Sequence, residues 1–125
     1  MEMIMNHNQL FQAAHAAGMN ALNAATPTPM RIVQADVWGN PVPDAKVYDV
    51  PEGCCGFAWV RIKGNTAFGR EMKKHGLFSR AYPTGLQFWV GEGGQSVERK
   101  EAFARAFAKV LRDNGIDAYA ESRLD

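Results

Sequence analysis

Apolar side chains recur at helical spacing in two long stretches of the chain. Residues 8–25 carry a narrow apolar stripe at i, i+4 and i+8 positions, which predicts an alanine-rich amphipathic helix. The Thr-Pro-Thr-Pro sequence of residues 26–29 ends this helix and forms a short, stiff linker. The clearest helix is expected over residues 97–113, capped by Ser96. Its apolar positions fit the helical repeat without a miss: Phe103, Ala106, Phe107, Val110 and Leu111.

Strict alternation of apolar and polar residues predicts strands between the helices. In residues 56–62, Ala58, Val60 and Ile62 fall on one face, and the side chains between them fall on the other. A third, shorter helix over residues 66–76 follows this strand, with Thr66 as N-cap and a closing glycine. The expected strands cover residues 31–37, 56–62, 86–90 and 116–121, with a short strand from Ala45 to Val50 that could form a hairpin with the first.

These elements predict an α+β fold in a single domain over residues 1–125. Residues 1–29 form the N-terminal helix and its proline-rich linker, and residues 30–125 form the α+β core. The order is helix, hairpin, then β-α-β-α-β with one sheet, which fits a two-layer sandwich. The side chains expected to be nearly fully buried are Val60, Ile62, Leu86, Phe88, Phe103, Phe107, Val110 and Leu111.

Composition and charge narrow the class of function. Apolar residues make up 46% of the 125 residues and charged residues 22%, which is typical of a globular domain rather than a disordered chain. The net charge of +1 excludes a polycation that binds nucleic acid through bulk charge. The charge is uneven, however, because residues 51–90 carry six basic side chains against two acidic ones.

Alternation also gathers aromatic side chains on the sheet face opposite the core. Aromatic residues on an open sheet can stack nucleic acid bases, and a second subunit or the first helix could instead cover them. We expect a second subunit or a ligand to complete their burial, because the stripe of the first helix is mostly alanine and glycine. The candidate binding residues are Phe57, Trp59, Trp89 and Tyr119, with Arg61 and Lys63 at the rim.

Cys54 and Cys55 offer an alternative chemistry. A thiolate with a histidine partner can act as a nucleophile, and His75 lies at a predicted helix end where the dipole favours its protonated form. No local Cys-His signature accompanies them, so a thiol-dependent enzyme is the second hypothesis. The three histidines lack companion ligands at metal-binding spacing, and the sequence predicts neither a metal site nor a cofactor.

Adjacent cysteines rarely bridge each other, so the pair indicates a reducing compartment. The N-terminus shows no basic region followed by a long apolar run, and any of three early methionines could be the initiator. No apolar run approaches the roughly 18–20 residues of a membrane span. We therefore expect a cytoplasmic protein with no membrane partner.

Residues 54–125 resemble small proteins encoded in tailed-phage and prophage genomes, to which no activity is attached. The resemblance implies a phage origin and a cytoplasmic setting. It is carried by residues 55–60 (Cys-Gly-Phe-Ala-Trp-Val), 64–65 (Gly-Asn), 89–90 (Trp-Val), 95–96 (Gln-Ser), 99–102 (Arg-Lys-Glu-Ala) and 122–125 (Ser-Arg-Leu-Asp). The leading hypothesis is a non-enzymatic binding module, homodimeric, whose further partner is a protein or a single-stranded nucleic acid.

Overall fold

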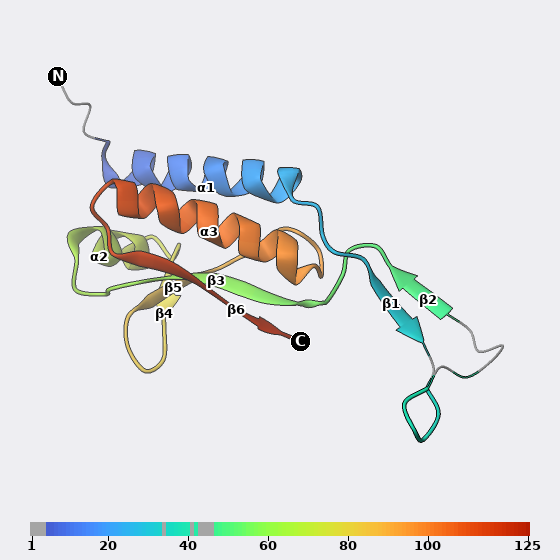
Figure 1. Cartoon of the computed structure of the whole chain (residues 1–125). Helices are drawn as coiled ribbons and strands as arrows, with labels where there is room; N and C mark the ends of the chain where they lie inside the picture. Colours follow the sequence, from blue (N-terminus) through green and yellow to red (C-terminus); the bar gives the residue numbers. More distant parts are fainter. Residues whose placement is uncertain (1–4, 34, 41, 43–46) are drawn as a thin grey trace.

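The computed structural model in Figure 1 describes residues 5–33, 35–40, 42 and 47–125, and it confirms an α+β fold. The helices lie close to the predicted ranges. The strand predicted over residues 56–62 has those bounds, and the final strand begins two residues late and continues further. The elements in chain order are α1 (His7–Ala24), β1 (Met30–Val33), β2 (Val47–Val50), β3 (Gly56–Ile62), α2 (Ala67–Lys74), β4 (Ser79–Arg80), β5 (Leu86–Trp89), α3 (Val97–Asp113) and β6 (Ala118–Leu124).

Side-chain caps set where the helices begin. The Thr66 hydroxyl accepts a hydrogen bond from the Gly69 amide at 3.0 Å, and the Ser96 hydroxyl accepts one from the Arg99 amide at 3.3 Å. Both predicted N-caps are therefore confirmed. The cap of α1 was not predicted. Asn6 and Gln9 form a reciprocal capping box there.

The main sheet has four antiparallel strands in the order β4-β5-β3-β6. Together with α2 and α3, these strands follow the sequence β-α-β-β-α-β, which is the split β-α-β topology. Strand β4 was not predicted, because a two-residue strand leaves no alternating pattern to detect. The central strands are β3 and β5, and the edges are β4 and β6.

All of the apolar packing between helices and sheet is on one sheet face. Helix α3 lies over β3 and β6, and α1 packs along α3, where Phe11 reaches the ring of Phe88 at 5.7 Å and the ring of Phe107 at 5.6 Å. The predicted burial is confirmed for Phe103, Phe107, Leu111, Val60, Ile62 and Leu86. Helix α1 therefore belongs to the core layer and does not cover the aromatic face.

Two of the predicted core residues are only partly buried: Phe88 and Val110. Strand β4 pairs with Leu86 and Gln87 alone, so Phe88 has no strand beside it on that side. Val110 lies in the last turns of α3, beyond the point where Phe11 packs on Phe107. Burial at these two positions depended on neighbours that the sequence pattern could not place.

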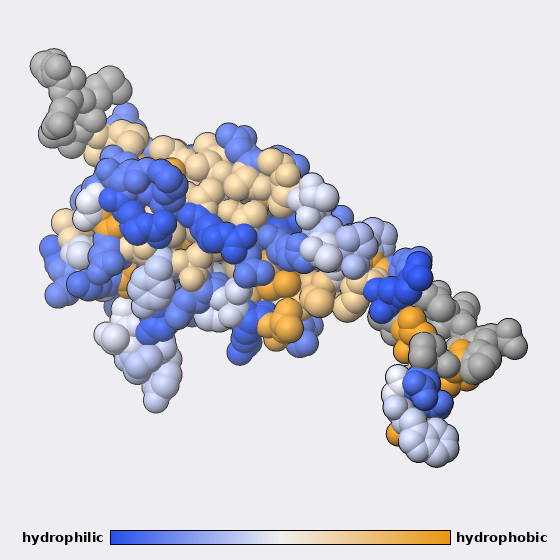
Figure 2. All heavy atoms as spheres, viewed as in Figure 1, coloured by the Kyte–Doolittle hydropathy of each residue, from blue (hydrophilic) through white to orange (hydrophobic). Residues whose placement is uncertain are grey.

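Strands β1 and β2 pair with each other in a separate two-stranded sheet that projects from the body as an arm (Figures 1 and 2). The strand predicted over residues 31–37 ends at Val33, and residue 34 lies outside the described residues. Beyond that residue, Ala35 still takes part in a β-bridge. The extended strand does not reach residue 37, because the Asp36 carboxylate accepts hydrogen bonds from the amides of Trp38 and Asn40 and folds residues 36–40 into a turn. The predicted second strand begins at Val47, and residues 45 and 46 of it lie outside the described part.

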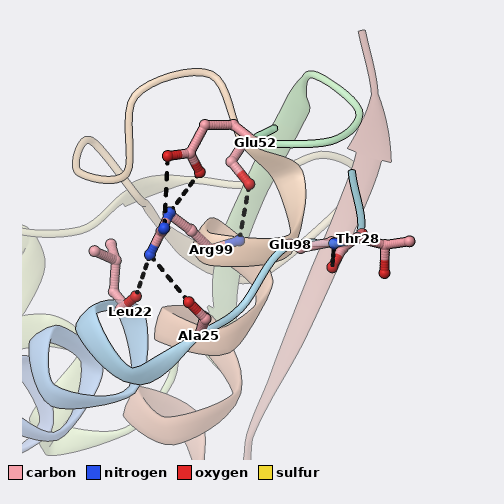
Figure 3. Close-up of polar contacts among 7 residues, drawn as sticks. Leu22, Ala25, Thr28, Glu52, Glu98 and Arg99 are labelled. Carbon is pink, nitrogen blue, oxygen red and sulfur yellow. Dashed lines mark hydrogen bonds and ion pairs between the residues drawn. The ribbon is translucent and has the colours of Figure 1, made fainter. Parts of the chain in front are cut away.

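Arg99 joins the arm to the body (Figure 3). Its guanidinium donates to the carbonyls of Leu22 and Ala25 at 3.1 Å each and to the Glu52 carboxylate at 2.6 Å. Glu98, the preceding residue, accepts a hydrogen bond from the Thr28 amide at 2.9 Å. The N-terminus of α3 therefore holds the end of α1, the linker and the turn after β2.

Charges of both signs along a helix are typical of a solvated face, but the basic residues at the N-terminal end of α3 do not lie on such a face. Besides Arg99, Lys100 is buried, with only 7% of its surface exposed. Its ammonium donates to the Gly56 carbonyl at 3.1 Å and lies 5.4 Å from the centre of the Phe57 ring. Mixed charges along a helix do not reveal which of them contact other elements.

Replacing Arg99 with methionine should lower the free energy of unfolding by about 1–3 kcal/mol. The change keeps most of the aliphatic stem but leaves two carbonyls and a carboxylate without their donor. Urea titration measures the loss. Arg105→Met is the matched control, because Arg105 is 66% exposed on the same helix and its pairing with Glu101 is long, at 3.8 Å. Equal losses from both variants would contradict the anchoring role of Arg99.

Candidate binding face of the sheet

The aromatic residues predicted on the far side of the sheet do share one face. Antiparallel register places Trp59 of β3 directly opposite Trp89 of β5 and opposite Glu121 of β6, and side chains of directly paired residues project to the same face. The helices pack on the other face, so no described helix lies over these side chains. We call this surface the aromatic face, made by Phe57, Trp59, Arg61, Gln87, Trp89, Tyr119, Glu121 and Arg123.

Three aromatic rings form a continuous cluster on the two central strands. The indoles of Trp59 and Trp89 are stacked, with ring centres 4.8 Å apart and planes inclined by 26°. The Phe57 ring meets Trp89 edge-on at 5.9 Å. Trp89 remains 41% exposed, while Phe57 and Trp59 are half-buried. The cluster therefore offers an accessible π surface centred on Trp89.

Glu121 and Arg61 hold the cluster in place. The Trp59 indole N–H donates to the Glu121 carboxylate at 2.8 Å, and Arg61 lies 3.4 Å from the same oxygen. The Arg61 guanidinium also donates to the carbonyls of Tyr82 and Thr84, at 3.1 and 2.7 Å. The Arg61 side chain is only 17% exposed. Its role is therefore to hold the aromatic face and the β4–β5 loop in place, and its charge is not free to bind a ligand.

Arg123 is the cation on this face that the sequence analysis missed as a site residue. Its guanidinium carbon lies 5.3 Å from the centre of the Phe57 ring and 5.9 Å from that of Trp89. Among the described residues, no carboxylate lies within ion-pair distance of it. Alternation along β6 could have revealed Arg123, because Arg123 and Tyr119 are four residues apart and therefore project to the same face of the sheet. Tyr82, in the loop that Arg61 holds, is a further exposed ring that no pattern predicted.

A groove of about 630 Å³ lies at the end of the aromatic face, where β3 and β5 meet the start of β6. The groove is lined by Arg61 and Lys63, which the sequence placed at the rim of the face, and by Tyr119, and Lys63 pairs with Asp117 at 3.2 Å. A second hollow continues from Gly64 and Gly85, which line both, and contains Lys73 and Arg80. This end of the sheet is therefore the basic end, with Arg61, Lys63, Lys73 and Arg80 around the two hollows.

The two cysteines and His75 are not brought into contact. The Cys54 thiol lies 3.7 Å from the sulfur of Met30, and Cys55 forms an isolated bridge with Ser96. His75 caps the end of α2 and lies 3.8 Å from Glu71. The cysteines precede β3 and His75 follows α2, so both a strand and a helix separate them along the chain. No hydrogen bond within the described part of the chain joins a cysteine to a histidine.

The remaining histidines make structural contacts. His7 is hydrogen-bonded to Glu71, and His15 packs edge-on against Phe103 at 5.4 Å between ring centres. In the residues that the structure covers, no group of three or more histidine, cysteine or acidic side chains is arranged to hold a metal ion. None of the described helices has the length and apolar character needed to cross a membrane.

Comparisons with protein-family models, with curated proteins and with solved structures gave no match to this chain. The resemblance to phage-encoded proteins therefore stays a prediction that no comparison supports.

Proposed function

We propose that the protein is a non-enzymatic binding module that takes up single-stranded nucleic acid on its aromatic face. The observation that carries the proposal is the cluster of Phe57, Trp59 and Trp89 on the two central strands of a sheet whose helices all lie on the other side. Stacking on such rings stabilises each bound base by about 1–3 kcal/mol and tolerates any sequence, because every base has a π face.

The topology supports the same conclusion by analogy. RNA-recognition modules use a four-stranded sheet with aromatic side chains on its open face to stack two or three bases. Here the sheet also has four strands, and the three clustered rings lie on its central strands β3 and β5. The analogy concerns the arrangement of the rings, since the chain carries no basic-aromatic strand signature of those modules.

Charge near the cluster suits a phosphate backbone. Arg123 lies against two of the rings without a carboxylate partner in the described structure, so its guanidinium can donate to phosphate while staying against the rings. At the basic end, Lys63 extends this surface into the neighbouring groove. Arg80, which pairs with Leu86 of the core face, and Lys73 of α2 lie around the end of the sheet on the helix side. A strand stacked on Trp89 would have cations at both ends of the cluster, although the protein as a whole is nearly neutral.

A second copy of the chain on the aromatic face is the competing occupant, favoured by the exposed Trp89 ring. The thiol-dependent enzyme remains the alternative of a different class, and it would need a rearrangement that brings Cys54 or Cys55 to His75. The cytoplasmic setting and the phage origin accompany the proposal as expectations from the sequence.

The proposal predicts that Trp89→Ala weakens binding of a fluorescently labelled, mixed-sequence single-stranded oligonucleotide by about 1–3 kcal/mol, or roughly 5- to 150-fold in Kd. The reason is the loss of the most exposed ring of the cluster. Fluorescence anisotropy measures the affinity. Binding of the unaltered protein should also weaken as salt rises, because bound phosphates release counterions.

Trp38→Ala is the matched control, because Trp38 is 82% exposed in the turn of residues 36–40 after β1 and does not belong to the main sheet. It should leave the affinity unchanged. Absence of binding by the unaltered protein at low salt, or equal losses from both tryptophan variants, would refute nucleic acid as the occupant. If self-association protects Trp89 from fluorescence quenching in the absence of oligonucleotide, the result would favour the second copy as the occupant.

A further inference from the structure

Strand β6 leaves one long edge of the main sheet unpaired. It has seven residues, pairs with β3 along its whole length, and has no strand on its other side within the described part of the chain. The opposite edge, β4, has only two residues. Exposed edges of this length are templates for pairing with another strand.

Hydrogen bonding shows which backbone groups of β6 point outward. The Asp125 amide donates to the Cys55 carbonyl of the neighbouring strand, so the odd-numbered residues of β6 bond to β3. The even-numbered residues therefore direct their amides and carbonyls away from the sheet. The Ala118 carbonyl confirms this orientation, because the Arg112 side chain donates to it from α3 at 2.9 Å. Ala120, Ser122 and Leu124 remain as the open edge.

We propose that β6 pairs with β6 of a second copy of this chain, in an antiparallel register centred on Ser122. In this register Ser122 faces Ser122 of the other copy, and Ala120 faces Leu124. All of these residues carry the outward backbone groups, so the two edges would exchange hydrogen bonds directly. The result is one continuous sheet of eight strands, built by a two-fold axis through Ser122.

Charge complementarity selects this register. Centring on Ser122 places Glu121 opposite Arg123 of the other copy, and the two-fold axis repeats that pair. Centring on Glu121 or on Arg123 would instead place like charges directly opposite each other, which destabilises a strand pair. Centring on Ala120 would use the Ala118 carbonyl that Arg112 already occupies.

A hollow beside the edge fits the same arrangement. It has a volume of about 90 Å³ and is lined by Ala120, Ser122, Glu121 and, from α3, Glu101 and Arg105. Leu124 is 66% exposed and has the same parity as Ala120, so it projects on the helix side of the sheet. Opposite Ala120, the Leu124 side chain of a second copy would lie at this hollow. The pairing therefore buries an apolar side chain as well as satisfying backbone groups.

Disulfide trapping tests the register. In a Cys54→Ser, Cys55→Ser background, Ser122→Cys should form a covalent dimer under mild oxidation, because directly paired residues lie about 5.5 Å apart between Cα atoms, within disulfide range. Ala120→Cys and Leu124→Cys should each form no covalent dimer alone and should cross-link when the two variants are mixed. These are matched controls on the same edge. Self-cross-linking of either control alone would overturn the register.

Light scattering without any nucleic acid tests the dimer itself, independently of oligonucleotide binding. The unaltered chain should have twice the mass of one chain at high micromolar concentration, and Ser122→Pro should be monomeric, since proline removes an amide that points outward and leaves the β3 ladder intact. A monomeric unaltered chain would overturn the proposal. This holds also if the β6 edge then proves to pair with a strand of another protein. Should the proline variant fail to fold, the cysteine variants decide the question.

Discussion

Replacing Phe107 with alanine should lower the free energy of unfolding by about 3–5 kcal/mol. Phe107 is fully buried, and its ring centre lies 5.6 Å from that of Phe11 in α1, 5.0 Å from Phe88 in β5 and 6.2 Å from Phe78. The side chain thus joins helix α1, the sheet and the segment after α2. Removing it leaves a cavity that three separate elements would have to move to fill, and a dense interior relaxes only in part.

Urea titration followed by circular dichroism measures this loss. Phe57→Ala is the matched control, because it removes the same side chain from the aromatic face, where Phe57 is only half-buried. It should cost clearly less than Phe107→Ala. A loss below about 1 kcal/mol for Phe107→Ala would place the residue outside the core.

Gly56→Ala is expected to destabilise the protein by about 1–3 kcal/mol, although it adds only one methyl group. A Cβ atom at residue 56 would lie 2.5 Å from the Arg123 carbonyl of β6 and 2.8 Å from the Val97 side chain of α3. The close approach of β3, β6 and α3 at this point requires glycine. Because the nearest atom is backbone, the strand itself must shift to admit the methyl group.

Gly91→Ala is the matched control for that change. No atom lies within 4 Å of the position its Cβ would take, and its backbone does not require glycine. Thermal unfolding of the two variants should show a lower Tm for Gly56→Ala and little change for Gly91→Ala. If Gly56→Ala also shifts Arg123, the folded variant should bind an oligonucleotide more weakly than the unaltered protein does. Equal Tm values for both variants would contradict the close packing at Gly56.

The periodicity of side chains determined the helices, the central strands and the two faces of the sheet. Phe103, Phe107 and Leu111 had to share a helix face, and Phe57 and Trp59 had to leave the core face together, because both follow from the fixed geometry of a helix and a strand. The caps at Thr66 and Ser96 were equally local, since each depends on one side chain and an amide three residues away.

Tertiary structure decided which elements meet, and no local pattern carries that information. The register of β3 with β5 and β6 brought Trp59, Trp89 and Arg123 together, and the packing of α1 on α3 left their face open. Tertiary packing also gave Arg99 and Lys100 backbone partners on other elements, the Leu22 and Gly56 carbonyls, although the helix pattern was typical of a solvated face. Cys54 and His75, which the sequence allowed as partners, instead contact the Met30 sulfur and Glu71, and no hydrogen bond joins them in the described part of the chain.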